Sequence, residues 1–164
     1  TMLLSALEHV HSHDCVHCDI KPENAVFASH NDMSSLKLID FGISTACCEA
    51  GCHGVGGTPG FCAPEVTTGI FSKKADLWSM GVLTHLLLTG RMVKYNSKQT
   101  LHSRKLLRLS PEAQSFVRAL LQFNPALRLN ATEALEHPWL ASHTLSSCTW
   151  LPSQLTTLST ALPT

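Results

Sequence analysis

The sequence predicts a mainly α-helical fold of one compact domain with a short β-hairpin, and three observations support this. Of the 164 residues, 44% are hydrophobic, which is enough to build a core. Apolar residues recur at helical spacing over residues 2–12 and on one face of a stretch after Ser110, and they lie nearly all round a helix over residues 73–89. Two short apolar runs, residues 25–28 and 36–39, flank a polar stretch and predict a small antiparallel pair of strands.

The N-terminal half is expected to hold one helix, the hairpin and a loop. Residues 2–12 carry Leu3, Leu4, Leu7 and Val10 near helical spacing. Residues 43–60 are predicted to form a loop, because glycines and a proline disfavour regular structure there. These residues are Gly51, Gly54, Gly56, Gly57, Pro59 and Gly60.

A buried central helix is predicted over residues 73–89, because its apolar residues lie nearly all round the helix axis. Gly90 is expected to end it as a left-handed C-cap. The next helix should start with Ser110 as N-cap and Pro111 at the first position, and close before Pro125.

Asn130 followed by Glu133 resembles a capping box and predicts a further helix that stops at residues 137–139. Residues 141–164 are rich in Ser, Thr, Leu and Pro without periodicity and are expected to be a disordered tail. The domain is therefore predicted to cover residues 1–140.

Charge and composition exclude several classes of partner. Lys and Arg number 12, as do Asp and Glu, so no net field recruits nucleic acid or an anionic membrane. The chain has no membrane-length apolar run and no signal-peptide start, which favours an intracellular protein, cytoplasmic or nuclear. The seven cysteines are odd in number and unevenly spaced, and we interpret them as reduced thiols.

Five short motifs follow one another in a defined order along residues 17–128. They are His17-x-Asp19-x-Lys21-x-x-Asn24, Asp40-Phe41-Gly42, Ala63-Pro64-Glu65, Asp76-x-Trp78-Ser79-x-Gly81 and Arg128. In order and spacing the set resembles the serine/threonine protein kinase family, and over roughly residues 1–140 it resembles the C-terminal lobe of that fold with the hairpin at the catalytic cleft. The ending at residues 137–139 and the loop at 21–24 look like the calcium/calmodulin-dependent group.

The resemblance implies transfer of the γ-phosphoryl group of ATP to protein Ser or Thr hydroxyls, with Mg²⁺. It implies that Asp19 accepts the substrate hydroxyl proton, that Lys21 places a charge on the transferring group, and that Thr58 hydrogen-bonds Asp19. Together, Lys21 and Thr58 argue against tyrosine specificity. Asn24 and Asp40 are implied to ligate Mg²⁺ through oxygen atoms.

The remaining motif residues are implied to be structural. Glu65 and Arg128 resemble a buried ion pair, and loss of one partner would cost about 3–5 kcal/mol. Asp76 resembles an anchor for the backbone of the catalytic loop. His17, Phe41 and Gly42 are implied to act in packing and turn formation.

The sequence also departs from the family pattern. Cys18 stands where regulated kinases have arginine, so switching through a phosphorylated loop is not expected. Only 19 residues separate Gly90 from Ser110, which shortens a region where the family has a substrate-docking surface. No glycine-rich loop and no strand lysine are present, so the N-terminal lobe is expected to be missing and this piece alone to be a poor catalyst.

Two functions therefore stay open. One is a serine/threonine kinase represented by part of its catalytic domain, and the other is a catalytically dead kinase-like regulatory or scaffold module. In either case we expect apolar surface that a partner covers, where the missing lobe would dock. A zinc site built from Cys15, Cys18, Cys47, Cys48, Cys52 and His53 is a minor alternative to thiols without metal.

Overall fold

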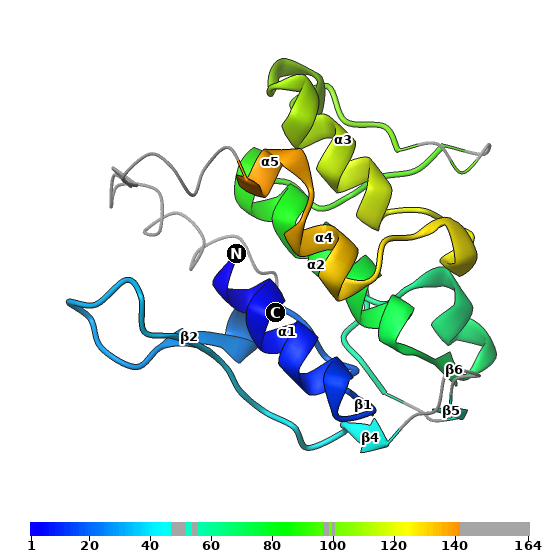
Figure 1. Ribbon diagram of the computed structural model, residues 1–164. Helices are drawn as coiled ribbons and strands as arrows, with labels where there is room; N and C mark the ends of the chain where they lie inside the picture. The colour runs from blue at the N-terminus through cyan, green and yellow to red at the C-terminus, as the bar shows by residue number, and fades with distance from the viewer. Residues whose placement is uncertain (47–51, 54–55, 97–98, 100, 142–164) are drawn as a thin grey trace.

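The helix α2 (Lys73–Thr89) forms the centre of the structure, and the other helices pack around it (Figure 1). This computed structural model describes residues 1–46, 52–53, 56–96, 99 and 101–141. Ser72 caps the start of α2 by accepting a hydrogen bond from the Ala75 amide, and Gly90 ends it with φ 65°. The bounds and the C-cap at Gly90 confirm the sequence prediction, whereas the N-cap at Ser72 was not predicted. Leu87 departs from the all-round burial, because it is exposed.

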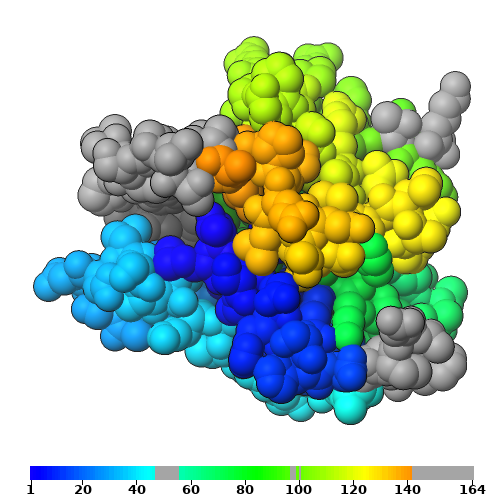
Figure 2. Space-filling view, in the orientation of Figure 1, coloured from blue at the N-terminus to red at the C-terminus, as the bar shows by residue number. Residues whose placement is uncertain are grey.

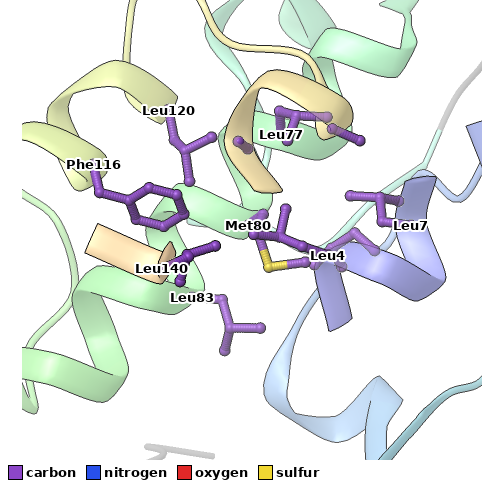
Figure 3. Close-up of a cluster of buried hydrophobic side chains, with 11 residues drawn as sticks. Leu4, Leu7, Leu77, Met80, Leu83, Phe116, Leu120 and Leu140 are labelled. Atoms are coloured by element: carbon purple, nitrogen blue, oxygen red, sulfur yellow. The ribbon is translucent and has the colours of Figure 1, made fainter. Parts of the chain in front are cut away.

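One core cluster joins α2 to α1 (Met2–Ser12) and to the C-terminal helices. The labelled side chains in Figure 3 converge on Met80 from four helices. Their burial supplies most of the driving force that holds α1 against the rest of the molecule, at roughly 1.5–3 kcal/mol for each large side chain. The buried members are Leu4, Leu7, Ile20, Leu77, Met80, Leu83, Phe116, Leu120, Ala131, Ala134 and Leu140.

A second core cluster lies on the other side of α2, against α3 (Pro111–Leu120). Trp78 and Val82 of α2 pack there with Val117 of α3. Gly81 allows the two helices to approach closely, because a Cβ at this position would lie 2.8 Å from Cβ of Leu120. Glycine is therefore the residue that fits at position 81.

The predicted hairpin is present. Strand β2 (Ala25–Phe27) pairs antiparallel with β3 (Leu36–Leu38), with Ala25 opposite Leu38 and Phe27 opposite Leu36. In Figures 1 and 2 the hairpin lies beside α1, at one edge of the molecule. Its open end carries the residues that precede β2 and follow β3, and these belong to the candidate site.

The prediction of a loop over residues 43–60 was wrong in two places. Strand β4 (Thr45–Ala46) pairs with β1 (Cys15–Val16), and β5 (Cys52–His53) pairs with β6 (Ile70–Phe71). Both ladders join segments distant in the sequence, so the local glycine content did not reveal them. Residues 47–51 and 54–55, with Gly51 and Gly54 of the predicted loop, lie outside the described part of the chain.

The C-terminal helices follow their local signals with one exception. Ser110 caps α3, which ends at Leu120, and Asn130 with Glu133 forms a complete capping box at the start of α4 (Ala131–Leu135). Pro138 was predicted to end the helical region, but it starts a further short helix, α5 (Pro138–Ala141), because proline fits the first turn of a helix. Four 3-10 turns complete the structure: Pro22–Asn24, Pro64–Thr68, Leu106–Arg108 and Pro125–Leu127.

The mainly α-helical prediction is thus confirmed for the described residues. The predicted tail begins at Ala141, which belongs to α5, and residues 142–164 lie outside the description. Among the helices that are described, none is both long enough and apolar enough to cross a bilayer.

Candidate active site

Asp76, at the start of α2, holds the backbone of the loop that contains Asp19. Its carboxylate accepts the backbone N–H groups of His17 at 2.8 Å and of Cys18 at 2.9 Å. Nε2 of His11, on α1, lies 2.9 Å from the same carboxylate. All but 1% of the Asp76 side chain is buried, so these partners replace the water that the charge has lost.

The loop needs this support because Cys18 has φ 70°, a left-handed conformation that costs a non-glycine residue roughly 1–3 kcal/mol. The bond from the Cys18 amide to Asp76 fixes that conformation. It turns the chain so that Asp19 faces Lys21, Asn24 and Thr58. Cysteine in place of the family's arginine at position 18 therefore does not remove this support, because Asp76 still accepts the backbone N–H groups of His17 and Cys18.

Asp19 lies at the centre of a group of polar side chains. Its Oδ1 accepts the Thr58 hydroxyl at 2.6 Å, and its Oδ2 lies 2.7 Å from Nζ of Lys21. Lys21 also donates to the Thr58 oxygen at 2.9 Å, which closes a triangle. The Asn24 amide nitrogen donates to the Asp19 backbone oxygen at 2.8 Å and to Oδ2 at 3.2 Å.

These contacts determine the charge state of Asp19. Burial raises the pKa of this carboxyl, but hydrogen bonds from Lys21 and Thr58 outweigh it, and the pKa lies below its ordinary value. The hydrogen bond to Asp19 raises the pKa of Lys21 in turn. Both directions agree on an ion pair at neutral pH, with Asp19 ionised and able to accept a proton.

The hairpin brings Asn24 and Asp40 to the same edge. Asn24 precedes β2, Asp40 follows β3, and the Ile39 amide donates to the Asn24 carbonyl at 2.9 Å. Asp40 has φ 63°, is exposed, and accepts the Gly42 amide at 3.2 Å. Within the described chain no hydrogen bond links Asp40 to Asp19, but its charge contributes to the raised pKa of Lys21.

The donor atoms at this edge fit a small hard cation. Because the Asn24 nitrogen is committed to Asp19, its amide oxygen is the ligand atom that remains. Asp40 adds a carboxylate, and an amide oxygen with a carboxylate is the oxygen chemistry that Mg²⁺ takes in proteins. Both residues lie at the open end of the hairpin, where Asn24 is buried and Asp40 is exposed.

His17 connects the two loops. The Asp19 amide donates to Nδ1 of His17 at 3.2 Å, so the proton lies on Nε2, which donates to the Ile39 carbonyl at 3.0 Å. Its ring meets Phe41 edge-on, with 4.7 Å between centroids. His17 is buried as expected of a packing residue, whereas Phe41 is 45% exposed.

Glu65 and Arg128 form a buried ion pair away from Asp19. The guanidinium donates to both carboxylate oxygens, at 2.6 and 3.1 Å, and also to the backbone carbonyls of Lys74 and Gln122. The Arg128 side chain is fully buried and lies 5.1 Å from the centroid of Trp78. The pair thus ties the segment before α2 to the segment before α4.

Exposed apolar side chains occur on β2 and on the segment that follows β3. Such a group of neighbouring apolar residues is typical of a surface that another molecule or segment covers. They are Val26, Phe27, Ile39, Phe41 and Ile43.

The sequence analysis missed His11, whose ring bonds Asp76. The available signal was its position four residues after Leu7, on the buried face of α1, where a polar side chain needs a partner. The zinc alternative gains no support, because the described residues contain no cluster of three potential metal ligands. Cys47 and Cys48 lie outside the described residues, as do the side chains of Cys52 and His53.

Comparison with known proteins gives the family. Residues 1–140 match the family model described as the protein kinase domain. The chain is 34% identical over 150 residues to the probable serine/threonine-protein kinase pXi of Dictyostelium discoideum, covering 84% of this chain and 21% of that protein.

Two further relatives are similar in extent. CDPK-related kinase 4 of Arabidopsis thaliana is 37% identical over 151 residues, covering 84% of this chain and 25% of the relative. The delta subunit of calcium/calmodulin-dependent protein kinase type II from Oryctolagus cuniculus is 32% identical over 154 residues, with 85% and 29% covered. The chain thus spans less than a third of the length of these relatives. It belongs to the serine/threonine protein kinase family.

Proposed function

We propose that this chain is the C-terminal lobe of a kinase catalytic domain that transfers the γ-phosphoryl group of ATP to Ser or Thr hydroxyls of proteins. The observation that carries the proposal is the ionised Asp19 carboxylate, held by Thr58, Lys21 and Asn24. A carboxylate fixed on several sides can orient one incoming hydroxyl, which is the main task of a protein in phosphoryl transfer.

In this proposal the substrate hydroxyl donates its hydrogen bond to Asp19 and passes its proton there as its oxygen bonds to the γ-phosphorus of ATP. The bond from that phosphorus to the bridging oxygen breaks, and ADP leaves. The lowered pKa of Asp19 supports this role, because the carboxylate is ionised before the substrate arrives. The Lys21 ammonium, 2.7 Å from Asp19, stands where it can neutralise charge on the transferring group.

Asn24 and Asp40 would hold Mg²⁺, which when bound neutralises negative charge on the phosphates of ATP. The shared hairpin supports this assignment, because it fixes the spacing of the two donors through the Ile39–Asn24 backbone bond. The exposed apolar residues beside them support a second protein surface over the site. That surface could come from the same polypeptide or from a partner.

A transfer assay with radiolabelled ATP, Mg²⁺ and a Ser/Thr-containing acceptor protein tests the proposal. Asp19→Asn should lower the rate by about a hundred- to ten-thousandfold, the usual contribution of a general base. Asp32→Asn is the matched control and should keep the rate, because Asp32 lies in the exposed turn of the hairpin and its carboxylate bonds Ser34. Measurable transfer by the wild type together with an equal rate for Asp19→Asn would end the proposal.

Binding of the nucleotide complex is measured separately by thermal shift. Mg²⁺ and ATP together should raise Tm, and Asp40→Asn should reduce that shift. The competing function, a kinase-like module without catalysis, is suggested by Cys18 in place of the family arginine. A wild-type chain that binds partners but transfers no phosphate under any condition would favour that module.

A further inference from the structure

The basic residues of this neutral chain are unevenly distributed. Between Asp76 and Glu112 the sequence contains no Asp or Glu. The same interval holds half of all Lys and Arg residues, namely Arg91, Lys94, Lys98, Arg104, Lys105 and Arg108. The segment that joins α2 to the upper end of α3 in Figure 1 is therefore strongly positive, although the whole chain has no net charge.

The buried His85 of α2 holds the two ends of this segment together. One ring nitrogen bonds the Arg91 carbonyl at 2.9 Å, and the other lies 2.8 Å from the Ser103 hydroxyl. Because a carbonyl only accepts, Nδ1 carries the proton and Ser103 donates to Nε2. The His85 imidazole therefore holds Arg91 and Ser103, the residue before Arg104, close to each other.

Further bonds tighten the same arrangement. Lys105 donates to the Thr89 carbonyl at 2.8 Å, and the His102 amide donates to the Lys94 carbonyl at 2.8 Å. Tyr95 and Leu101 form an isolated antiparallel bridge. These contacts hold the parts of the segment close together, and we call the exposed Lys, Arg and apolar residues of this segment the basic ledge. It comprises Arg91, Met92, Lys94, Arg104, Lys105, Leu107 and Arg108.

The ledge presents its charges to solvent. Its basic residues are all exposed, and none of them forms an ion pair with a residue in the described part of the chain. The first acidic residue that follows is Glu112, exposed on the first turn of α3. Met92 and Leu107 add exposed apolar surface among the cations.

Met92 connects the ledge to the candidate active site. Its terminal methyl group lies 3.1 Å from the position that a Cβ on Gly60 would occupy. Gly60 is two residues after Thr58, which bonds Asp19. A segment lying along the ledge could therefore continue toward the hydroxyl-binding position at Asp19.

We propose that the basic ledge binds an acidic stretch of the protein substrate, one that carries Asp or Glu residues around an apolar side chain. This inference rests on the proposed kinase function and names the class of substrate. The cations supply the charge complementarity, and Met92 and Leu107 supply apolar contact for one or two side chains.

Other anionic partners fit the ledge less well. Single-stranded nucleic acid binds through aromatic rings on which bases stack, but Tyr95 packs its ring against Trp78 with 5.5 Å between centroids. A membrane-surface site needs a continuous apolar face, whereas the exposed apolar residues of the ledge are Met92 and Leu107.

Fluorescence anisotropy without ATP tests the docking. The probe is a fluorescein-labelled peptide of glutamate and leucine residues around one serine, and its control has glutamine in place of every glutamate. We expect the glutamate peptide to bind about tenfold more tightly or better, and its affinity to fall as salt rises past ~0.15 M. Equal binding of the two peptides would overturn the proposal.

Two double variants locate the binding. Arg91→Gln with Arg104→Gln should weaken binding of the glutamate peptide about tenfold, because two uncompensated cations are lost. Lys37→Gln with Arg118→Gln removes the same charge from outside the ledge and should leave binding unchanged. Equal loss in both variants would contradict the assignment to the ledge.

Two further outcomes separate this inference from the kinase function and from other partners. Ledge-dependent binding of the glutamate peptide, with phosphate transfer that Asp19→Asn does not lower, would support the docking and end only the catalytic proposal. Phosphorylation at the same rate in both double variants and wild type would end only the docking proposal. Ledge-dependent binding of phosphatidylserine vesicles or oligothymidylate, with no binding of the glutamate peptide, would overturn the choice of an acidic peptide.

Discussion

The hydroxyl of Thr58 donates a 2.6 Å hydrogen bond to Asp19, across 39 positions of the sequence. Its oxygen accepts from Lys21 at 2.9 Å, so one hydroxyl serves both members of the ion pair. The segment that contains Thr58 thereby fixes the orientation of the carboxylate on which the proposed chemistry depends. A substitution at Thr58 should therefore change the pKa of Asp19 although Asp19 itself is not replaced.

Thr58→Val removes this hydroxyl while it keeps the shape of the side chain. We expect the pKa of Asp19 to rise toward its ordinary value, because one of the hydrogen bonds that lower it is lost. A carboxyl with a lowered pKa stabilises the fold above its unfolded-state pKa, and this stabilisation is lost as pH falls through the folded-state pKa. The variant should therefore lose less stability on acidification than the wild type.

Carbon-detected NMR titration of the Asp19 carboxyl checks the first result, and urea unfolding at several acidic pH values checks the second. Thr58→Ser is the control, because serine retains the hydroxyl and should keep the low pKa. An unchanged titration of Asp19 in Thr58→Val would show that the bond has no influence on the charge.

The relationship between Thr58 and Asp19 also shows what sequence reasoning can reach. Local signals predicted α2, the N-cap at Ser110 and the capping box at Asn130, since each depends on residues within one or two turns. The ladder between β1 and β4 was missed because it joins two-residue segments about thirty positions apart. No local pattern encodes such a pairing.

The candidate site was predictable for a different reason. The family resemblance implied roles for Asp19, Lys21, Asn24 and Thr58, and the structure places their side chains in one hydrogen-bonded group. His11 was not chosen, because its partner Asp76 is 65 positions away and a single histidine on a helix carries no motif. The basic ledge was not predicted, because the net charge of the whole chain is zero and does not show where the basic residues cluster.

Breaking the Glu65–Arg128 pair should destabilise the fold strongly. Glu65→Ala leaves a fully buried guanidinium without its carboxylate, and we expect the free energy of unfolding to fall by about 3–5 kcal/mol. Arg128→Met removes the cation and the five hydrogen bonds that its side chain donates, and it should cost a similar amount. Urea denaturation followed by circular dichroism gives the values.

The double variant tests whether the two effects share one cause. With both charges gone, the loss should be smaller than the sum of the single losses. The exposed pair of Lys73 and Asp14, 2.7 Å apart, provides the comparison, and Lys73→Gln should leave the midpoint of unfolding unchanged. Additive losses in the buried pair would mean that packing, rather than charge, holds these segments together.

Gly81 is expected to be intolerant of substitution although it lies inside a helix. Gly81→Ala would gain about 1 kcal/mol in helix propensity. The added methyl group would meet Leu120 Cβ at 2.8 Å and two Leu121 atoms at 3.0 Å, and such overpacking costs about 1–3 kcal/mol. Because Leu120 Cβ lies next to the α3 backbone and cannot rotate away, we expect a net loss of stability.

A compensating change distinguishes steric conflict from other causes. Leu121→Ala removes two of the three close contacts, so Gly81→Ala should cost less in that background than in the wild type. Thermal unfolding of the four chains gives the coupling. A Gly81→Ala chain more stable than the wild type would indicate that α2 and α3 can separate without cost.

The stability of the fold should fall on mild acidification because of His85. Burial lowers the pKa of this imidazole below its ordinary 6.5, although the hydrogen bond to the Arg91 carbonyl opposes the effect. The unfolded chain therefore binds a proton near pH 6.5 while the folded chain keeps His85 neutral. Unfolding thus takes up a proton, and stability is lost as pH falls from 6.5 toward the folded-state pKa.

Replacement of His85 should remove this part of the pH dependence. His85→Gln should lower stability at neutral pH, because the imidazole hydrogen bonds to the Arg91 carbonyl and the Ser103 hydroxyl are lost. The urea midpoint of the variant should nevertheless change less between about pH 8 and about pH 5 than that of the wild type. His13→Gln, at the exposed end of α1, is the control. His137 also has a lowered pKa from burial, so some acid sensitivity should persist in His85→Gln. If His85→Gln kept the full acid sensitivity of the wild type, other groups would have to take up the proton. The contacts of His85 with Arg91 and Ser103 would then not respond to pH.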